Sequence, residues 1–265
     1  MTVRYEVGAD HVGRITLDRP EAKNALTVEM RDAIVDAVRS ARADDEVRAL
    51  LITGVGDAFC AGMDLSASTL AKASEPGFNN RSTAEALRVG VQSFIRDLWE
   101  LDKPTVAAVN GAAVGPGAHL ALACDFVLVH DETRFMWSFS KIGLVVDAGG
   151  AYLLPRLVGL PRAKAMVLLG EGATGAEAVD LGLAYRCVAL GELAAAADEL
   201  AVRLASGPTR SLGLSKRLLN ASFETDIAHS LDQEGSFQAL AASADDLAEG
   251  MAAFKERRAA DFTGS

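Results

Sequence analysis

The chain has 265 residues with 26 basic and 36 acidic side chains, so its formal net charge is −10. Half of the residues are hydrophobic and 23% are charged, which is typical of a folded domain with a large core and excludes a disordered chain. An acidic chain lacks the basic surface that a nucleic-acid backbone requires, so we expect no nucleic-acid partner.

The N-terminal sequence and the cysteines indicate a cytoplasmic protein. Residues 1–6 show no apolar run behind a basic stretch, and no apolar segment reaches the roughly 18 residues that span a bilayer. We therefore expect no membrane partner. The three cysteines match neither a disulfide framework nor a zinc motif, so we expect reduced, packed thiols and no metal site. They are Cys60, Cys124 and Cys187.

The first hundred residues alternate strand and helix patterns. Residues 3–17 predict a hairpin of two short strands, and Thr27 is placed to cap a helix that ends near Asp44. The apolar run over 47–53 predicts a strand covered on both faces. Residues 65–84 show no sustained period and are a candidate lid, followed by a predicted helix at 85–101.

The next segments repeat a strand, a glycine turn, a helix and a strand, over 103–109, 110–117, 119–124 and 125–129. Helices are predicted over 152–158 and 163–170. Beyond Gly191 amphipathic helical patterns replace the strands, and one helix is introduced by a capping-box-like start at 243–246. These patterns predict an α/β core, residues 1–195, followed by a helical domain, residues 196–265.

Two glycine-rich segments, at 56–65 and 110–119, each follow an apolar strand. Glycine lets backbone amides approach a ligand closely, and a helix N-terminus adds partial positive charge, so both segments suit an anion or a developing oxyanion. Neither matches a P-loop or a dinucleotide fingerprint. Close packing of strand against helix is the alternative explanation for the same glycines.

Five motifs stand in order at characteristic spacings: RPEAKNAL at 19–26, FCAGMDL at 59–65, KPTVAAVNG at 103–111, LALACD at 120–125 and IGLVVDAGG at 142–150. With FKERR at 254–258, they closely resemble the enoyl-CoA hydratase/isomerase (crotonase) superfamily over nearly the whole chain. The resemblance implies an α/β fold, a crotonase-like spiral of strand-strand-helix repeats with a C-terminal helical trimerisation region. It also implies a homotrimer or hexamer, a CoA thioester as substrate (acyl-CoA or enoyl-CoA), and no metal or redox cofactor.

In this family two backbone amides bind the thioester oxygen and stabilise an enolate. Residue-by-residue matching makes the Met63 amide the first donor and assigns the second to Pro116. Proline has no N–H, so half of the family's oxyanion hole is missing here.

The side chains also depart from the hydratase pattern. Hydratases of the family use two glutamates to position and protonate water, and the matching positions here hold His119 and Phe139. Asp147 matches the position of the proton-shuttling carboxylate in isomerases of the family. His119 is a candidate second proton carrier or a replacement oxygen donor. The structural alternatives are a hydrogen-bonded core histidine at His119 and a helix cap at Asp147.

The resemblance also implies residues that contact CoA. The basic side chains at Lys23 and Arg257 match positions that meet the CoA phosphates, although exposed basic residues are often only solvated. Backbone near the first glycine loop is expected to meet the adenine. The predicted CoA-contacting set is Ala22, Lys23, Ala61, Gly62, Asp64, Leu65 and Arg257.

Three functions follow from this pattern. The leading one is an enzyme that shifts a C=C bond of an enoyl-CoA through an enolate, with Asp147 as the acid and base. The others are an enoyl-CoA hydratase in which His119 replaces one glutamate, and a non-catalytic acyl-CoA binder, which Pro116 favours. Residues 66–81 and 85–101 are expected to shape the acyl pocket.

Overall fold

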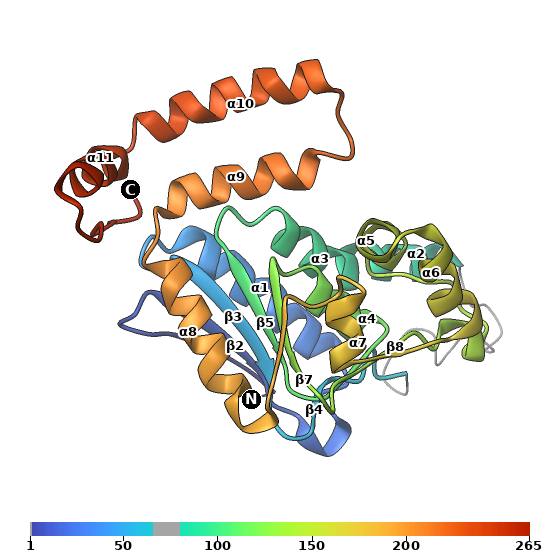
Figure 1. The fold of residues 1–265 in the computed structure, drawn as a ribbon. Helices are drawn as coiled ribbons and strands as arrows, with labels where there is room; N and C mark the ends of the chain where they lie inside the picture. Colours follow the sequence, from blue (N-terminus) through green and yellow to red (C-terminus); the bar gives the residue numbers. More distant parts are fainter. Residues whose placement is uncertain (1, 66–79) are drawn as a thin grey trace.

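Six strands form the larger of two sheets in the computed structural model, which describes residues 2–65 and 80–265 (Figure 1). The N-terminal hairpin is confirmed, with β1 and β2 antiparallel in the register Val3↔Leu17. All other pairings in this sheet are parallel, and its buried strands are continuously apolar as expected of a covered sheet. The order is β1 (Val3–Val7), β2 (Val12–Leu17), β3 (Ala49–Gly54), β5 (Thr105–Val109), β7 (Phe126–His130) and β10 (Arg186–Val188).

The second sheet has four short strands and positions the loops of interest. Each turn of the chain passes from a strand of the large sheet into one of the small sheet, as β3 to β4, β5 to β6 and β7 to β8, which confirms the spiral of strand-strand-helix repeats. The register Cys60↔Ala113 brings the ends of β4 and β6 side by side. The order is β4 (Ala58–Cys60), β6 (Ala112–Val114), β8 (Arg134–Met136) and β9 (Ala173–Thr174).

The helices of the core begin with α1, whose predicted cap is confirmed. The Thr27 hydroxyl accepts a hydrogen bond from the Met30 N–H at 3.2 Å. The predicted helix at 85–101 is instead two helices that meet at Gly90. The core helices are α1 (Val28–Ala43), α2 (Asn80–Val89), α3 (Val91–Trp99), α4 (Pro116–Leu122), α5 (Gly150–Val158), α6 (Leu160–Lys164), continued by a π-helical turn (Ala165–Leu169), and α7 (Gly175–Asp180).

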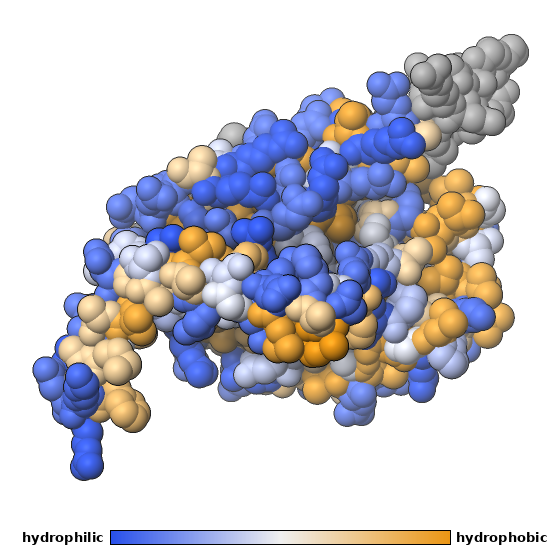
Figure 2. All heavy atoms as spheres, turned by 90° about the horizontal axis from the view of Figure 1, so that it is seen from above, coloured by the Kyte–Doolittle hydropathy of each residue, from blue (hydrophilic) through white to orange (hydrophobic). Residues whose placement is uncertain are grey.

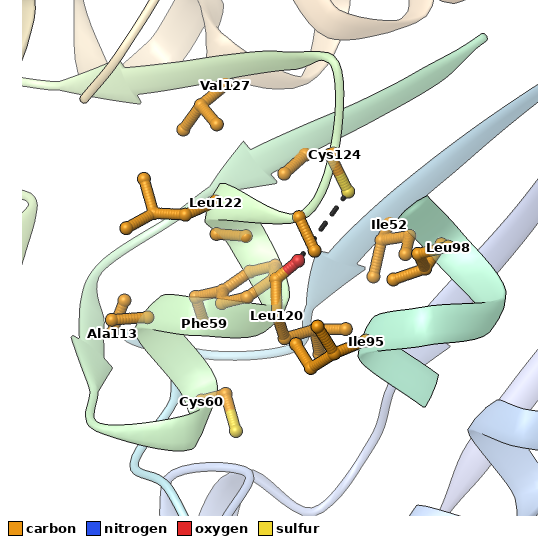
Figure 3. Close-up of a cluster of buried hydrophobic side chains, with 14 of the residues drawn as sticks. Ile52, Phe59, Cys60, Ile95, Leu98, Ala113, Leu120, Leu122, Cys124 and Val127 are labelled. Carbon is orange, nitrogen blue, oxygen red and sulfur yellow. Dashed lines mark hydrogen bonds between the residues drawn. The ribbon is translucent and has the colours of Figure 1, made fainter. Parts of the chain in front are cut away.

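One part of the main core lies between α3, α4 and the neighbouring strands (Figure 3). Phe59, Leu120 and Leu98 are fully buried there. The Cys124 thiol donates to the Leu120 carbonyl at 3.7 Å, and all three cysteines are free, as the sequence predicts. The candidate lid at 65–84 lies mostly outside the described residues.

The C-terminal helices divide differently from the predicted boundary between 195 and 196. This boundary falls inside α8 (Leu193–Ala205), which packs on β3, β5 and β7 and belongs to the core. The helices that leave the sheet are α9 (Thr209–Ala221), α10 (Ile227–Ala242) and α11 (Asp245–Glu256), which form an arm (Figure 1).

The predicted capping box before α11 is wrong. Ala244 precedes the helix and supplies no side-chain cap, and the Ser243 hydroxyl instead donates to the Leu240 carbonyl at 2.8 Å, at the end of α10. The arm exposes large apolar side chains, among them Phe223, Ile227 and Phe254 at 72%, 74% and 82% exposure. Figure 2 shows apolar surface along this arm and also at the opposite end. Leu160, at the start of α6, and Leu168, in the π-helical turn after it, are also exposed.

Across the described ranges, no helix combines the length and the apolar composition that crossing a bilayer requires. In the same ranges no three His, Cys, Asp or Glu side chains are grouped so that they would hold a metal ion.

Candidate active site

A cavity of about 170 Å³ lies where the loops after β4, β6 and β8 meet. Among the described residues that line it, only Ser138 and Asp147 carry polar side chains, so this lining is largely apolar. Two larger cavities lie against the helical arm and contain none of the predicted site residues. The lining residues are Ala61, Gly62, Met63, Leu65, Val114, Gly115, Pro116, Ser138, Phe139, Ile142, Leu144 and Asp147.

The first glycine loop contributes Met63 to the lining of this cavity. Leu26 forms a parallel bridge to Met63, because its N–H donates to the Gly62 carbonyl at 2.7 Å and its carbonyl accepts from the Asp64 N–H at 2.9 Å. In such a bridge the central residue of the second segment directs its own N–H and C=O away from the first. Met63 therefore turns its N–H away from Leu26, which is the geometry that an oxyanion donor needs.

Gly62 makes this turn possible. Its φ is +88°, and a Cβ at this position would lie 2.8 Å from the Val114 carbonyl oxygen. Any side chain would thus force apart the two loops that face each other across the cavity.

The loop around residues 19–26 is fixed against the first glycine loop and brings the predicted CoA contacts together. The Ala61 N–H donates to the Lys23 carbonyl at 2.9 Å, so Ala22 and Lys23 lie beside Ala61. Lys23 is exposed, which leaves its ammonium group available to an anion.

Arg19 is a residue of this region that the sequence analysis did not single out. Its guanidinium forms a 2.8 Å ion pair with the Asp64 carboxylate, so the predicted contact at Asp64 holds the loop in place. Asn24 is fully buried and donates to the Ala58 carbonyl at 2.8 Å. Both residues belong to the RPEAKNAL motif, and their long-range partners are not visible in the sequence.

The second glycine loop has a different surface. The Gly115 N–H is used in a 2.9 Å bond to the Met136 carbonyl, and Pro116 then begins α4 and lines the cavity. Where the first loop presents an amide, the second presents a proline ring without an N–H. Gly115 has a φ of +49°, and a Cβ there would lie 3.2 Å from the Phe139 ring.

Asp147 lies opposite these loops on a tight turn before α5. The Gly150 N–H donates to the Asp147 carbonyl at 2.9 Å, across two left-handed residues, Ala148 at φ 48° and Gly149 at φ 77°. Ala148 is fully buried, and such a conformation costs a non-glycine residue about 1 kcal/mol. The Asp147 carboxylate does not cap α5, because the N-cap is Gly149 and has no side-chain bond.

The Asp147 carboxylate has the properties of a proton-transferring group. Its Oδ1 is buried and has no hydrogen-bond partner among the described residues. Burial raises the pKa of this carboxyl to about 6, because the charged form loses hydration that the cavity does not replace.

His119 does not line the cavity and is fully buried behind it. Its Nε2 accepts a hydrogen bond from the Trp137 Nε1–H at 3.0 Å, and its ring stacks on Phe139 with centroids 5.9 Å apart. Burial lowers its pKa to about 4, so the imidazole is neutral at physiological pH. This placement agrees with the core-histidine alternative rather than with a proton carrier.

Arg257 is not brought to the cavity within this chain. It ends α11 in a left-handed conformation with φ 56°, is exposed, and lies on the arm at the far side of the fold from β8 (Figure 1). Leu65, in contrast, lines the cavity as expected and is 47% exposed at its edge.

Known proteins are similar to this chain in sequence and in fold. The family model described as enoyl-CoA hydratase/isomerase matches residues 8–265. The 1,2-epoxyphenylacetyl-CoA isomerase of Escherichia coli K12 is 37% identical over 94% of both chains. The trans-2-decenoyl-[acyl-carrier-protein] isomerase of Streptococcus mutans is 33% identical over 96% of this chain and 95% of its own. The crystal structure of an enoyl-CoA hydratase from Bacillus anthracis covers 100% of both chains with a TM-score of 0.91 and 28% identity. The chain therefore belongs to the enoyl-CoA hydratase/isomerase family.

Proposed function

We propose that this family member is an isomerase that moves the C=C bond of an enoyl-CoA through an enolate. The Asp147 carboxylate takes the α-proton of a 3-enoyl thioester, and the electron pair passes to the thioester oxygen. Asp147 then returns the proton to the γ-carbon, which gives the conjugated 2-enoyl thioester. No atom is gained or lost, so the reaction needs no co-reactant and no cofactor.

One observation carries this proposal: Asp147, whose Oδ1 is buried and unpartnered among the described residues, lines the same cavity as Met63. A carboxyl with a pKa of about 6 is ionised at neutral pH and still basic enough to remove a proton and return it. The Met63 N–H is the donor that stabilises the developing oxyanion.

The walls of the cavity favour isomerisation over hydration. Phe139 occupies the position of a hydratase glutamate and lies in the wall with Pro116, so among the described lining residues Asp147 alone offers a charged group to hold a water. The second hydratase position, His119, is buried and already accepts a hydrogen bond at Nε2. A hydratase with His119 as its acid and base is accordingly the weaker reading.

A CoA thioester fits the surroundings of the cavity. We propose that exposed Lys23 binds CoA phosphate and that the backbone of Ala22 and 61–65 lines the adenine site. We further propose a cytoplasmic homotrimer or hexamer, because the arm exposes Phe223, Ile227 and Phe254. In such an assembly Arg257 would serve the site of a neighbouring copy.

A second candidate is a non-catalytic acyl-CoA binder, which Pro116 specifically favours. Losing one oxyanion donor typically costs about 10² to 10³ in rate, and the remaining Met63 amide would then support binding but little chemistry.

The experiment that separates these functions incubates the protein with a 3-enoyl-CoA and follows the products by NMR and mass spectrometry. The isomerase gives a 2-enoyl-CoA, and Asp147→Asn abolishes its formation. In a parallel incubation with a 2-enoyl-CoA, a product heavier by one water, formed by wild type and by Asp147→Asn, would establish the hydratase. Binding without either product would establish the binder. The change Asp36→Asn, on the exposed face of α1, is the matched control.

A further inference from the structure

Behind the Asp147 turn lies a buried polar arrangement that proton transfer does not use. It contains His119 on α4, Trp137 after β8, and the backbone of Asp147 before α5. His119 and Trp137 are both fully buried, so their polar atoms depend on protein partners alone.

The hydrogen bond from Trp137 fixes the protonation pattern of His119. An indole N–H can only donate, so the His119 Nε2, 3.0 Å away, must present its lone pair. The ring proton of the neutral imidazole then sits on Nδ1. A ring that has its lone pair engaged and its only proton on the other nitrogen cannot shuttle a proton to substrate.

The Asp147 backbone lies close to the His119 ring. The carbonyl of Asp147 interacts with the His119 ring in the sense that favours an N–H on it, although burial acts more strongly in the opposite direction on its pKa. No described acceptor meets strict hydrogen-bond geometry at Nδ1 in this ligand-free chain. A loose contact of this kind is common before a substrate is bound and can tighten on binding.

Steric contacts hold the ring in this position on its other sides. Phe139 stacks on it almost parallel, at an interplanar angle of 6°. A Cβ built on Gly150 would lie 2.2 Å from the His119 Cε1 and 2.3 Å from its Nε2. Gly150 is the residue whose N–H closes the turn onto the Asp147 carbonyl, so the ring packs directly on the turn that carries the carboxylate.

We propose that His119 is a neutral positioning residue. Its ring is held by the hydrogen bond from Trp137, packs on the Asp147 turn and so keeps the Asp147 carboxylate at the cavity. It never touches substrate and never changes its protonation during turnover. This inference rests on the proposed function, because it assigns to Asp147 the proton transfer that the turn must aim.

The test compares three variants in the full-length protein. His119→Gln keeps an oxygen that accepts from Trp137 and an N–H₂ that reaches the Asp147 carbonyl, so it should retain at least about one third of kcat. His119→Leu removes both interactions, and kcat should fall by about 10-fold to 100-fold with KM within about 2-fold, as expected when a reacting group is displaced. His130→Leu replaces another buried histidine, at the end of β7 and away from the cavity, and should leave kcat unchanged.

Selective ¹⁵N labelling of the four histidines reads the protonation state directly. The His119 signals should report a neutral ring with the proton on Nδ1, constant from pH 6 to pH 8. A His119 signal that titrates in this range, or that carries its proton on Nε2, would overturn the proposal. Wild-type kcat in His119→Leu would overturn it as well.

Hydrogen exchange at the Gly150 amide separates this inference from the proposed function. If His119 positions the Asp147 turn, His119→Leu should weaken the protection of the Gly150 amide at least about 10-fold, because the turn loses its packing against the ring. If Asp147→Asn keeps full activity, the proposed function fails. Unchanged Gly150 protection in His119→Leu would instead refute the positioning role of His119. Should His119→Leu not fold, Trp137→Phe carries the same test, since it releases Nε2 and should produce a mixture of tautomers.

Discussion

The two glycine loops of the cavity follow neighbouring strands of the same sheet but offer a ligand different surfaces. The loop after β4 lines the cavity with Met63, whose N–H points away from Leu26 because of the bridge between the two residues. The loop after β6 places Pro116, which has no N–H, at the corresponding point. A single residue type therefore makes the difference, because a proline at the start of α4 leaves this position of the second loop without a backbone donor.

The opposite wall of the cavity supplies a different kind of group, a carboxylate. Asp147 contributes this desolvated side chain, and the other described lining side chains are apolar except for Ser138. A weaker oxyanion hole with a strong, well-placed base suits removal of an allylic α-proton, which is more acidic than that of a saturated thioester. Each experiment below perturbs one side of this arrangement.

Among substitutions in the two glycine loops, the largest effect is expected at Gly62. Gly62→Ala places a Cβ 2.8 Å from the Val114 carbonyl at a φ of +88°, so the loop must move and the Met63 amide with it. Isomerase kcat should fall by about 10² to 10³, the usual cost of an oxyanion donor. Gly191→Ala, where no atom lies within 4 Å of the new Cβ, should keep full activity. Unimpaired turnover in Gly62→Ala would show that the first loop does not act on the thioester.

Restoring the missing donor should increase the rate. Pro116→Ala gives the second loop an N–H at the first position of α4, and kcat should rise by about 10-fold, less than the full value of a donor because the loop is not evolved to aim it. Pro161→Ala, in the first turn of α6, is the matched proline control. A fall in kcat with unchanged stability would mean that the proline ring itself shapes the substrate site.

The pH dependence of the rate should report Asp147. Its carboxyl must be ionised to take the proton, so kcat/KM should decline roughly tenfold per pH unit as pH falls below about 6. His119, with a pKa of about 4, contributes no limb between pH 5 and pH 8, and His119→Gln should keep the profile. A value of kcat/KM that stays unchanged down to pH 5 would contradict the assignment of Asp147 as the base.

The last effect concerns stability and not rate. The pKa of Asp147 is about 6 in the folded chain against an ordinary value of 3.8, so its ionisation destabilises the fold and stability falls as pH rises from 4 through 6. Asp147→Asn should therefore raise the free energy of unfolding by up to about 3 kcal/mol at pH 8, with no gain at pH 4. Urea unfolding at both pH values measures it, and an equal change at both would exclude this origin.

Long, periodic elements were predictable from the sequence and short or long-range ones were not. Thr27 and the hairpin were predicted correctly because capping and alternation are local signals. The strands β6, β8 and β9 have two or three residues and carry no period that a sequence can show. The capping box at Ser243 failed because its hydroxyl closes the preceding helix instead.

The site followed the same rule. Asp147, Met63 and Leu65 were predicted as site residues and line one cavity. The orientation of His119 could not be predicted, because it depends on Trp137, 18 positions away, and on the stacking of Phe139. The position of Arg257 depends on how the arm leaves the core, which three-dimensional packing decides and local sequence does not.

The most direct test of the account incubates wild type and Asp147→Asn with a 3-enoyl-CoA in D₂O and follows deuterium at the α- and γ-carbons together with the double bond. The account predicts that wild type produces the 2-enoyl-CoA with deuterium exchange, and that Asp147→Asn binds the substrate with similar affinity but neither exchanges nor isomerises it. Equal exchange and isomerisation by both proteins would contradict the central claim that Asp147 transfers the proton.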